Sequence, residues 1–233
     1  MTDPLFREQN LTIDQTHALK TAAARLEDHF EGIFNRETIQ NFLASSYDQF
    51  AGNAKITNYL PLLAERFARQ RLQAFSRVEG FVNDGKPVVL FLCVHNAGKS
   101  QMALGFFEKL AGDRAIAWSG GSEPGNSLNQ YSVEAMTEVG IDITGEFPKP
   151  WTEETLRAAD VIVTMGCGDA CPVYPGKRYL DRELNALPGT SIENVRPVRD
   201  EIERRVRGLL EELNVQVVQD QVTHDAKTKT LER

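Results

Sequence analysis

The hydrophobic pattern of the chain changes near residue 80, and this change constrains the fold more than any other feature. After Pro87, apolar runs of strand length alternate with segments in which apolar residues recur at helical spacing. The runs are Val88–Leu92, Ala115–Trp118, Val161–Met165 and a weaker fourth, Lys177–Leu180; the helical segments are 100–110, 131–138, 152–159 and 195–213. Buried runs that alternate with helices are typical of βαβ units. We therefore expect an α/β domain over residues 87–219, with a four-stranded parallel sheet covered by helices on both faces.

The first 80 residues contain no such runs and predict an all-α three-helix module. Thr12 and Gln15 resemble a capping box, and Pro61 suits the first turn of a helix. Because the polar residues of this module form no obvious constellation, we expect it to be structural and to support a homodimer. Its basic residues are expected on a solvated face of the third helix: Arg66, Arg69, Arg71 and Arg77. Residues 81–86 are expected to form a linker, and residues 220–233 a disordered tail.

The charge and the cysteine content exclude several classes of protein. The net charge of −7 argues against general binding to nucleic acids or anionic membranes, because both favour basic proteins. The longest apolar run, residues 87–94, is too short to span a membrane, and the first residues do not resemble a signal peptide. We therefore expect a cytoplasmic protein. Its three cysteines, Cys93, Cys167 and Cys171, would stay reduced there, so they need a chemical explanation.

The segment from Cys93 to Ser100 is the most informative one chemically, because it joins the first strand to the next helix. Ligands of open α/β sheets bind beyond the carboxyl ends of the strands, where this loop lies. The small residues Ala97 and Gly98 allow the loop to curl so that its N–H groups bind an anion, supported by the positive end of the helix. The same potential would stabilise a Cys93 thiolate, to which the Ser100 hydroxyl could donate a hydrogen bond. Cys93 is therefore a candidate nucleophile.

Two other interpretations of this loop carry less weight. Cys93 could be a small buried hydrophobe at the end of a strand, but Cys, Gly, a cation and Ser occur together at one strand-to-helix junction. The Gly-Lys-Ser at 98–100 also occurs in Walker-type nucleotide loops. Those loops need an earlier glycine, and the preceding stretch Cys-Val-His-Asn-Ala contains none.

Several separated motifs resemble those of arsenate reductases built on the low-molecular-weight tyrosine phosphatase fold. The first is Cys-x5-cation-Ser at 93–100, continued by Gln-Met-Ala. Further motifs follow in the same order: Ser-Gly-Gly-Ser-Glu-Pro at 119–124, Val-Gly-Ile-Asp-Ile-Thr at 139–144, Val-Thr-Met-Gly-Cys-Gly-Asp-Ala-Cys-Pro at 163–172, and Val-Arg-Pro-Val-Arg-Asp at 195–200. The resemblance extends over residues 87–213. Residues 1–80 are similar to the helical N-terminal module of actinobacterial-type members.

The resemblance implies a function and a set of site residues. The oxyanion would be held by the loop residues Val94, His95, Asn96, Ala97, Gly98, Lys99 and Ser100. Cys93 would attack arsenate, Cys167 would resolve the intermediate, and Cys171 would leave a 167–171 disulfide for thioredoxin. The Cys-x3-Cys pair could instead be half of a zinc site, but the sequence offers no second Cys/His pair. We expect no metal and no cofactor.

The sequence departs from the family pattern at two places. Lys99 stands where the family usually has Arg, which removes the planar fork that binds two oxyanion oxygens. Asn185 and Ala186 stand where members typically have an Asp-Asp-Pro stretch that supplies an acid, so we consider Asp181 and Glu183 as candidate acids. Both departures are expected to impair activity.

These departures keep two alternatives open: a cysteine-based phosphatase, and a catalytically degenerate protein that binds oxyanions or senses redox state. A third alternative, an arsenate reductase that depends on mycothiol and a glutaredoxin-like partner, applies if the three cysteines form no internal relay.

Overall fold

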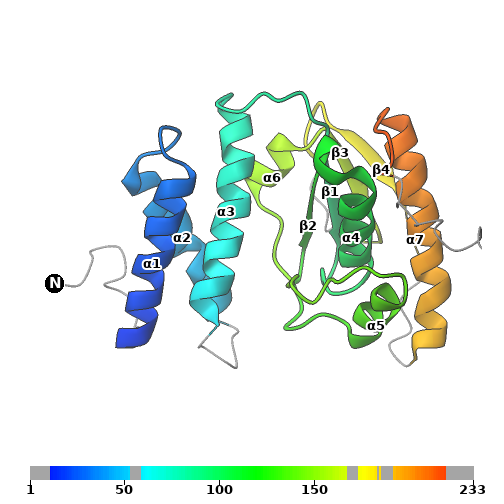
Figure 1. The fold of residues 1–233 in the computed structure, drawn as a ribbon, viewed down its shortest axis with the longest axis horizontal. Helices are drawn as coiled ribbons and strands as arrows, with labels where there is room; N and C mark the ends of the chain where they lie inside the picture. Colours follow the sequence, from blue (N-terminus) through cyan, green and yellow to red (C-terminus); the bar gives the residue numbers. More distant parts are fainter. Residues whose placement is uncertain (1–10, 53–58, 167–172, 183, 185–190, 219–233) are drawn as a thin grey trace, which may run out of the picture.

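The computed structural model describes residues 11–52, 59–166, 173–182, 184 and 191–218. Within these residues the chain forms helices, one short 3₁₀ turn and a parallel sheet (Figure 1). The α-helices are α1 (Ile13–His29), α2 (Arg36–Ala51), α3 (Leu60–Val78), α4 (Lys99–Ala111), α5 (Gln130–Glu138), α6 (Glu153–Ala158) and α7 (Ile192–Glu212); the 3₁₀ turn is η2 (Gly112–Arg114). The strands are β1 (Val88–Cys93), β2 (Ile116–Gly121), β3 (Val161–Thr164) and β4 (Arg178–Asp181). The expected fold class is confirmed.

The sheet has the order β2-β1-β3-β4, and each neighbouring pair is parallel. Strand β1 lies inside the sheet and is buried along its whole length, which explains why its sequence is continuously apolar. Alternate β1 side chains enter two different cores. Val89, Phe91 and Cys93 pack with α4, α5 and α7, whereas Val88, Leu90 and Leu92 pack with α6 and α3. Figure 1 shows these two helical layers on opposite sides of the sheet.

The N-terminal module is the expected bundle of three helices, and local signals explain its helix starts. Thr12 and Gln15 form the predicted reciprocal capping box at α1, and Pro61 lies in the first turn of α3. The bundle has its own core, centred on fully buried residues that include Leu19, Leu43 and Leu72. Helix α3 has a second role, because its Ala74 belongs to the core on one face of the sheet.

The four named arginines of α3 form ion pairs, and the expected solvated face holds for only two of them: the side chains of Arg66 and Arg69 are 40% and 38% exposed, whereas those of Arg71 and Arg77 are 16% and 13% exposed. Arg71 is the clearest case: its guanidinium contacts Glu154 of α6 at 2.5 Å and the hydroxyls of Ser45 and Ser46 of α2. The sequence could not show this because the partner carboxylates lie on other elements: Glu146 for Arg66, Glu154 for Arg71 and Asp84 for Arg77.

The expected linker 81–86 lies between α3 and β1, and the expected tail 220–233 lies outside the described residues. Among the described helices, none combines the length and hydrophobicity that a transmembrane segment requires.

Candidate active site

The candidate site lies where β1 ends and α4 begins, at the carboxyl edge of the sheet. Cys93 is the last residue of β1 and Lys99 is the first residue of α4, so residues 94–98 form a short loop between them. Cys93 is a free thiol and 5% exposed. The loop therefore lies over the positive end of a 13-residue helix.

The loop turns its carbonyl oxygens toward the segment that follows β2. The carbonyls of Val94, His95 and Ala97 accept hydrogen bonds from the backbone N–H groups of residues 123, 125 and 129. The N–H groups of His95, Ala97 and Gly98 donate to no described residue. A loop with its carbonyls engaged and its N–H groups free is suited to bind an anion.

The Cys93 sulfur is contacted by two hydrogen-bonding groups. The Asn96 N–H donates to Sγ at 3.2 Å, and the Ser100 hydroxyl lies 3.0 Å from it. The side-chain amide of Asn96 donates to Ser100 Oγ at 2.9 Å. Because Ser100 accepts that bond, its own hydrogen is free to point at the sulfur, where it would stabilise a thiolate. The Ser100 hydroxyl thus lies within hydrogen-bonding distance of the sulfur, and its catalytic role stays a prediction.

The orientation of the Asn96 amide is set by two donors behind the loop. Its Oδ1 accepts from Gln101 Nε2 and from the Lys149 backbone N–H, both at 3.0 Å. Gln101 is fully buried and also donates to the Asn96 and Phe147 carbonyls. Asn96 itself has a left-handed backbone with φ of 47°, a conformation that asparagine tolerates better than most residues.

Sequence reasoning missed the role of Gln101 and Lys149, because their partners are backbone carbonyls and one loop amide. Lys149 is 1% exposed, and its ammonium contacts Glu146 at 2.8 Å and lies 4.6 Å from the centroid of the Phe147 ring. Burial lowers the pKa of Lys149, and the carboxylate of Glu146 opposes that shift. The 146–149 segment thereby supports the loop from behind.

A close backbone approach explains one of the glycines after β2. A Cβ atom at Gly121 would lie 2.5 Å from the Val94 carbonyl oxygen and 3.1 Å from the Asn96 Cβ. Only glycine allows β2 to end this close to the loop.

The remaining predicted residues are spread over the carboxyl edge. Lys99 directs its ammonium to the carbonyl of Leu184, at 3.2 Å, beyond the end of β4. His95 contacts the Glu123 carbonyl through Nδ1 at 3.1 Å. Asp181 ends β4 and accepts from the Thr164 hydroxyl at 3.0 Å, two strands from β1, and no contact joins it to Cys93. Cys167, Cys171, Glu183 and Ala186 lie outside the described residues. Among described side chains, no three His, Cys, Asp or Glu residues gather as metal ligands would.

A buried cysteine that ends an inner strand of a parallel sheet, below an anion-receptive loop and a helix N-terminus, is the arrangement of a phosphatase-type site. The chain belongs to the low molecular weight phosphotyrosine protein phosphatase family, which residues 88–219 match. Residues 19–76 match the N-terminal domain of protein-tyrosine-phosphatase-like proteins.

The similar proteins carry more specific names. A putative arsenate reductase of Halobacterium salinarum is 34% identical over 129 residues, which are 53% of this chain and 91% of that protein. An arsenate reductase of Halalkalibacterium halodurans is 37% identical over 137 residues, 54% of this chain and 96% of that protein. The solved structure of a thioredoxin-dependent arsenate reductase of Corynebacterium glutamicum has a TM-score of 0.76 and 41% identity, and the alignment covers 86% of this chain and 98% of that one. The similarity to the last structure includes both the module and the α/β domain.

Proposed function

We propose that the protein reduces arsenate to arsenite, with Cys93 as the nucleophile. The observation that supports this most is the environment of the Cys93 sulfur: two hydrogen-bonding groups at 3.0 and 3.2 Å beneath a loop with free N–H groups. Such a site favours a thiolate next to an oxyanion. The names of the similar proteins indicate arsenate rather than a phosphate ester as the substrate.

In the proposed first step, the loop binds arsenate and Cys93 attacks arsenic. An S–As bond forms, and one arsenate oxygen leaves as water after it is protonated. Residues 94–100 contribute backbone donors, and Lys99 adds a positive charge at the start of α4. Asp181 and Glu183 are the candidate proton donors. Glu183 is retained as a candidate because it precedes Leu184 in the sequence, and the Leu184 carbonyl accepts a hydrogen bond from Lys99.

In the proposed second step, the Cys167 thiolate attacks the Cys93 sulfur. The S–As bond breaks, its electron pair goes to arsenic, and arsenite leaves a Cys93–Cys167 disulfide. Cys171 then attacks Cys167 and releases Cys93 as a thiolate, which moves the disulfide to 167–171. Reduced thioredoxin supplies the two electrons that restore both thiols. We place this chemistry in the cytoplasm, because the relay begins from free thiols.

A coupled assay tests the proposal. Oxidation of NADPH in the presence of thioredoxin and thioredoxin reductase should begin when arsenate is added, and Cys93→Ser should abolish it. Alkylation and mass spectrometry after arsenate treatment should show a 167–171 disulfide, which Cys167→Ser should prevent. Turnover with mycothiol and a glutaredoxin-like protein but not with thioredoxin would reject the proposed reductant.

Two other outcomes would reject the reaction itself. Hydrolysis of p-nitrophenyl phosphate without arsenate turnover would identify a phosphatase. Oxyanion binding without either reaction would identify a binding or sensing protein. The proposed homodimer through the helical module is checked separately, by light scattering of the protein and of a Tyr59→Glu variant, since Tyr59 is exposed on that module.

A further inference from the structure

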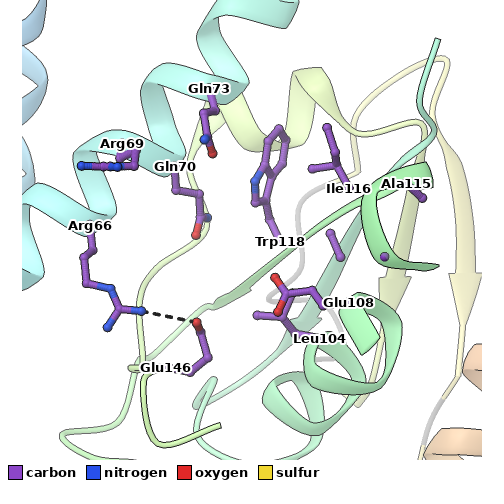
Figure 2. Close-up of a pocket in the computed structure, with 12 residues that line it drawn as sticks. Arg66, Arg69, Gln70, Gln73, Leu104, Glu108, Ala115, Ile116, Trp118 and Glu146 are labelled. Atoms are coloured by element: carbon purple, nitrogen blue, oxygen red, sulfur yellow. Dashed lines mark ion pairs between the residues drawn. The ribbon is translucent and has the colours of Figure 1, made fainter. Parts of the chain in front are cut away.

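The helical module contacts the α/β domain in the stretch between α5 and α6. Arg66 of α3 donates a hydrogen bond to the Gly145 carbonyl and forms an ion pair with Glu146 at 3.6 Å. Figure 2 shows this ion pair at one end of the pocket between α3 and the α/β domain. The guanidinium carbon of Arg66 also lies 5.3 Å from the centroid of the Phe147 ring. One side chain of the module therefore contacts three successive residues of the α/β domain.

A second helix of the module reaches the same stretch. The ring of Phe50, in α2, lies edge-on to the Phe147 ring, with 5.7 Å between the two centroids. Phe50 also contacts Phe67 of α3, at 5.5 Å between ring centroids, and packs against the core of the module. Phe147 is buried and is thus contacted by side chains from two helices of the module.

Lys149 links this stretch to the loop of the candidate active site. Its ammonium contacts Glu146 at 2.8 Å and lies 4.6 Å from the centroid of the Phe147 ring, so it shares both partners with Arg66. Its backbone N–H donates to Asn96 Oδ1 at 3.0 Å. The residues that Arg66 holds therefore also hold the Asn96 amide.

Two further hydrogen-bonding contacts lead from Asn96 to the sulfur. The side-chain amide of Asn96 donates to Ser100 Oγ at 2.9 Å, and this oxygen lies 3.0 Å from Cys93 Sγ. A continuous series of polar contacts, none longer than 3.6 Å, thus joins α3 to the sulfur. Contiguous networks of this kind can carry energetic coupling between distant groups.

We propose that Arg66 is a positioning residue for the Cys93 thiolate. It holds residues 145–149 against the module, and this stretch keeps the Asn96 amide in the orientation that directs the Ser100 hydroxyl to the sulfur. The module then takes part in the chemistry of its own chain. The inference rests on the proposed function, because it takes Cys93 as the reacting thiol, but its test needs no arsenate.

The rate at which iodoacetamide alkylates Cys93, measured as a function of pH by mass spectrometry of the peptide that contains it, tests the proposal. Arg66→Met keeps the aliphatic part of the side chain and removes the guanidinium. The pH of half-maximal rate should rise by at least about 0.4 unit, roughly a 2.5-fold change in the ionisation constant. The reason is that a less well-directed Ser100 hydroxyl stabilises the thiolate less. A curve that coincides with that of the wild type would overturn the proposal.

Arg69→Met is the matched control. Arg69 lies one turn further along α3, its side chain is as exposed as that of Arg66, and it pairs with Glu65 of its own helix. Its replacement removes the same charge from the same helix but leaves the contacts with residues 145–147 in place. The alkylation curve should therefore stay unchanged. An equal shift in both variants would reject the assigned role, because it would identify a general effect of charge or of module stability.

The route through Asn96 has a test of its own. Asn96→Gly removes the amide and tolerates the left-handed backbone at this position, where φ is 47°. In that background Arg66→Met should cause no further shift, because the link to Ser100 is already lost. A shift as large as in the wild-type background would show that Arg66 does not act through Asn96, which would also overturn the proposal.

The coupled arsenate assay, run on the same proteins, separates this proposal from the proposed function. If the wild type does not reduce arsenate while its alkylation curve depends on Arg66, the function fails and the positioning role stands. If arsenate is reduced and the alkylation curve does not depend on Arg66, the function stands and the positioning role fails.

Discussion

Replacement of Gln101 by methionine tests whether the support behind the loop matters. Methionine keeps the length of the side chain but removes the amide that donates to three acceptors, the Asn96 and Phe147 carbonyls and Asn96 Oδ1, all at 3.0 Å. Asn96 Oδ1 keeps the bond from the Lys149 N–H. The buried carbonyls of Asn96 and Phe147 lose the donor nearest to them, and each loss should lower the unfolding free energy by about 1–3 kcal/mol. We expect a loss of about 3 kcal/mol in unfolding free energy, or a Tm lower by roughly 6–12 °C for a chain of this size.

The same change should reduce turnover, because the Asn96 amide, which orients the Ser100 hydroxyl toward Cys93, would be held by one donor instead of two. Tryptophan fluorescence during heating measures the Tm, and the thioredoxin-coupled assay measures turnover at a temperature where the variant is folded. Gln130→Met, at an exposed position of α5, is the control. If Gln101→Met matches that control in both measurements, the reasoning about the loop support is refuted.

Four further changes have defined outcomes. Ser100→Ala removes a hydrogen bond to the Cys93 thiolate, worth about 1.5–3 kcal/mol. Iodoacetamide should therefore alkylate Cys93 at least about tenfold more slowly at neutral pH, as measured by mass spectrometry of the peptide that contains Cys93. An unchanged rate would contradict the hydrogen bond from the Ser100 hydroxyl to the sulfur. Lys99→Arg should raise kcat/KM for arsenate about threefold or more through a bidentate contact, and no change would count against a role of residue 99 in binding the oxyanion. Arg71→Ala removes the contacts with Glu154 and two serines and should lower the calorimetric Tm by several degrees, about 2 kcal/mol; a Tm equal to the wild type would mean that this ion pair does not hold α3 to α6. Glu108→Gln should raise the unfolding free energy above pH 7 by roughly 1 kcal/mol, after allowance for solvent screening. Desolvation, with repulsion from Glu146, raises the pKa of Glu108 from 4.5 to about 7 in the folded protein, so ionisation of this carboxyl lowers stability from about pH 4.5 upward, with the full effect above pH 7. The same difference in unfolding free energy between variant and wild type at pH 5 and pH 8, measured by urea denaturation, would refute this.

The fold could be predicted because its signals are local. A continuously apolar β1 flanked by Gly and Pro, with helical periodicity on either side, indicates a buried parallel strand without any knowledge of its partners. The two cores also follow from the sequence, because alternate side chains of Val88–Cys93 must point to opposite faces of the sheet. The sequence did not reveal that Ala74 of α3 packs against one of these faces. That contact depends on how the helical module docks on the sheet, which periodicity does not encode.

The candidate site was predictable only in part, for the same reason. Cys93, Ser100 and the anion-receptive loop are contiguous, so their spacing carries the signal. Gln101 and Lys149 act through partners up to 53 residues away in the sequence. A buried lysine directly after a Phe-Pro pair has no sequence pattern of its own. The sequence placed several arginines on α3 but did not reveal their carboxylate partners, which include Glu154 of α6 and Glu146 of the 146–149 segment.

The position of α7 has a consequence for biosynthesis. Val195, Ile202 and Val206 of this helix share a core with Phe91, Cys93 and α4, yet α7 is the last described element to leave the ribosome. Before α7 is synthesised, the apolar face of α4 that packs against it stays uncovered, and the loop of residues 94–98 is attached to a domain with an incomplete core. The helical module has its own core and is synthesised first, so it can fold while the α/β domain waits. A nascent chain would thus complete the core around Cys93 only after α7 has been synthesised.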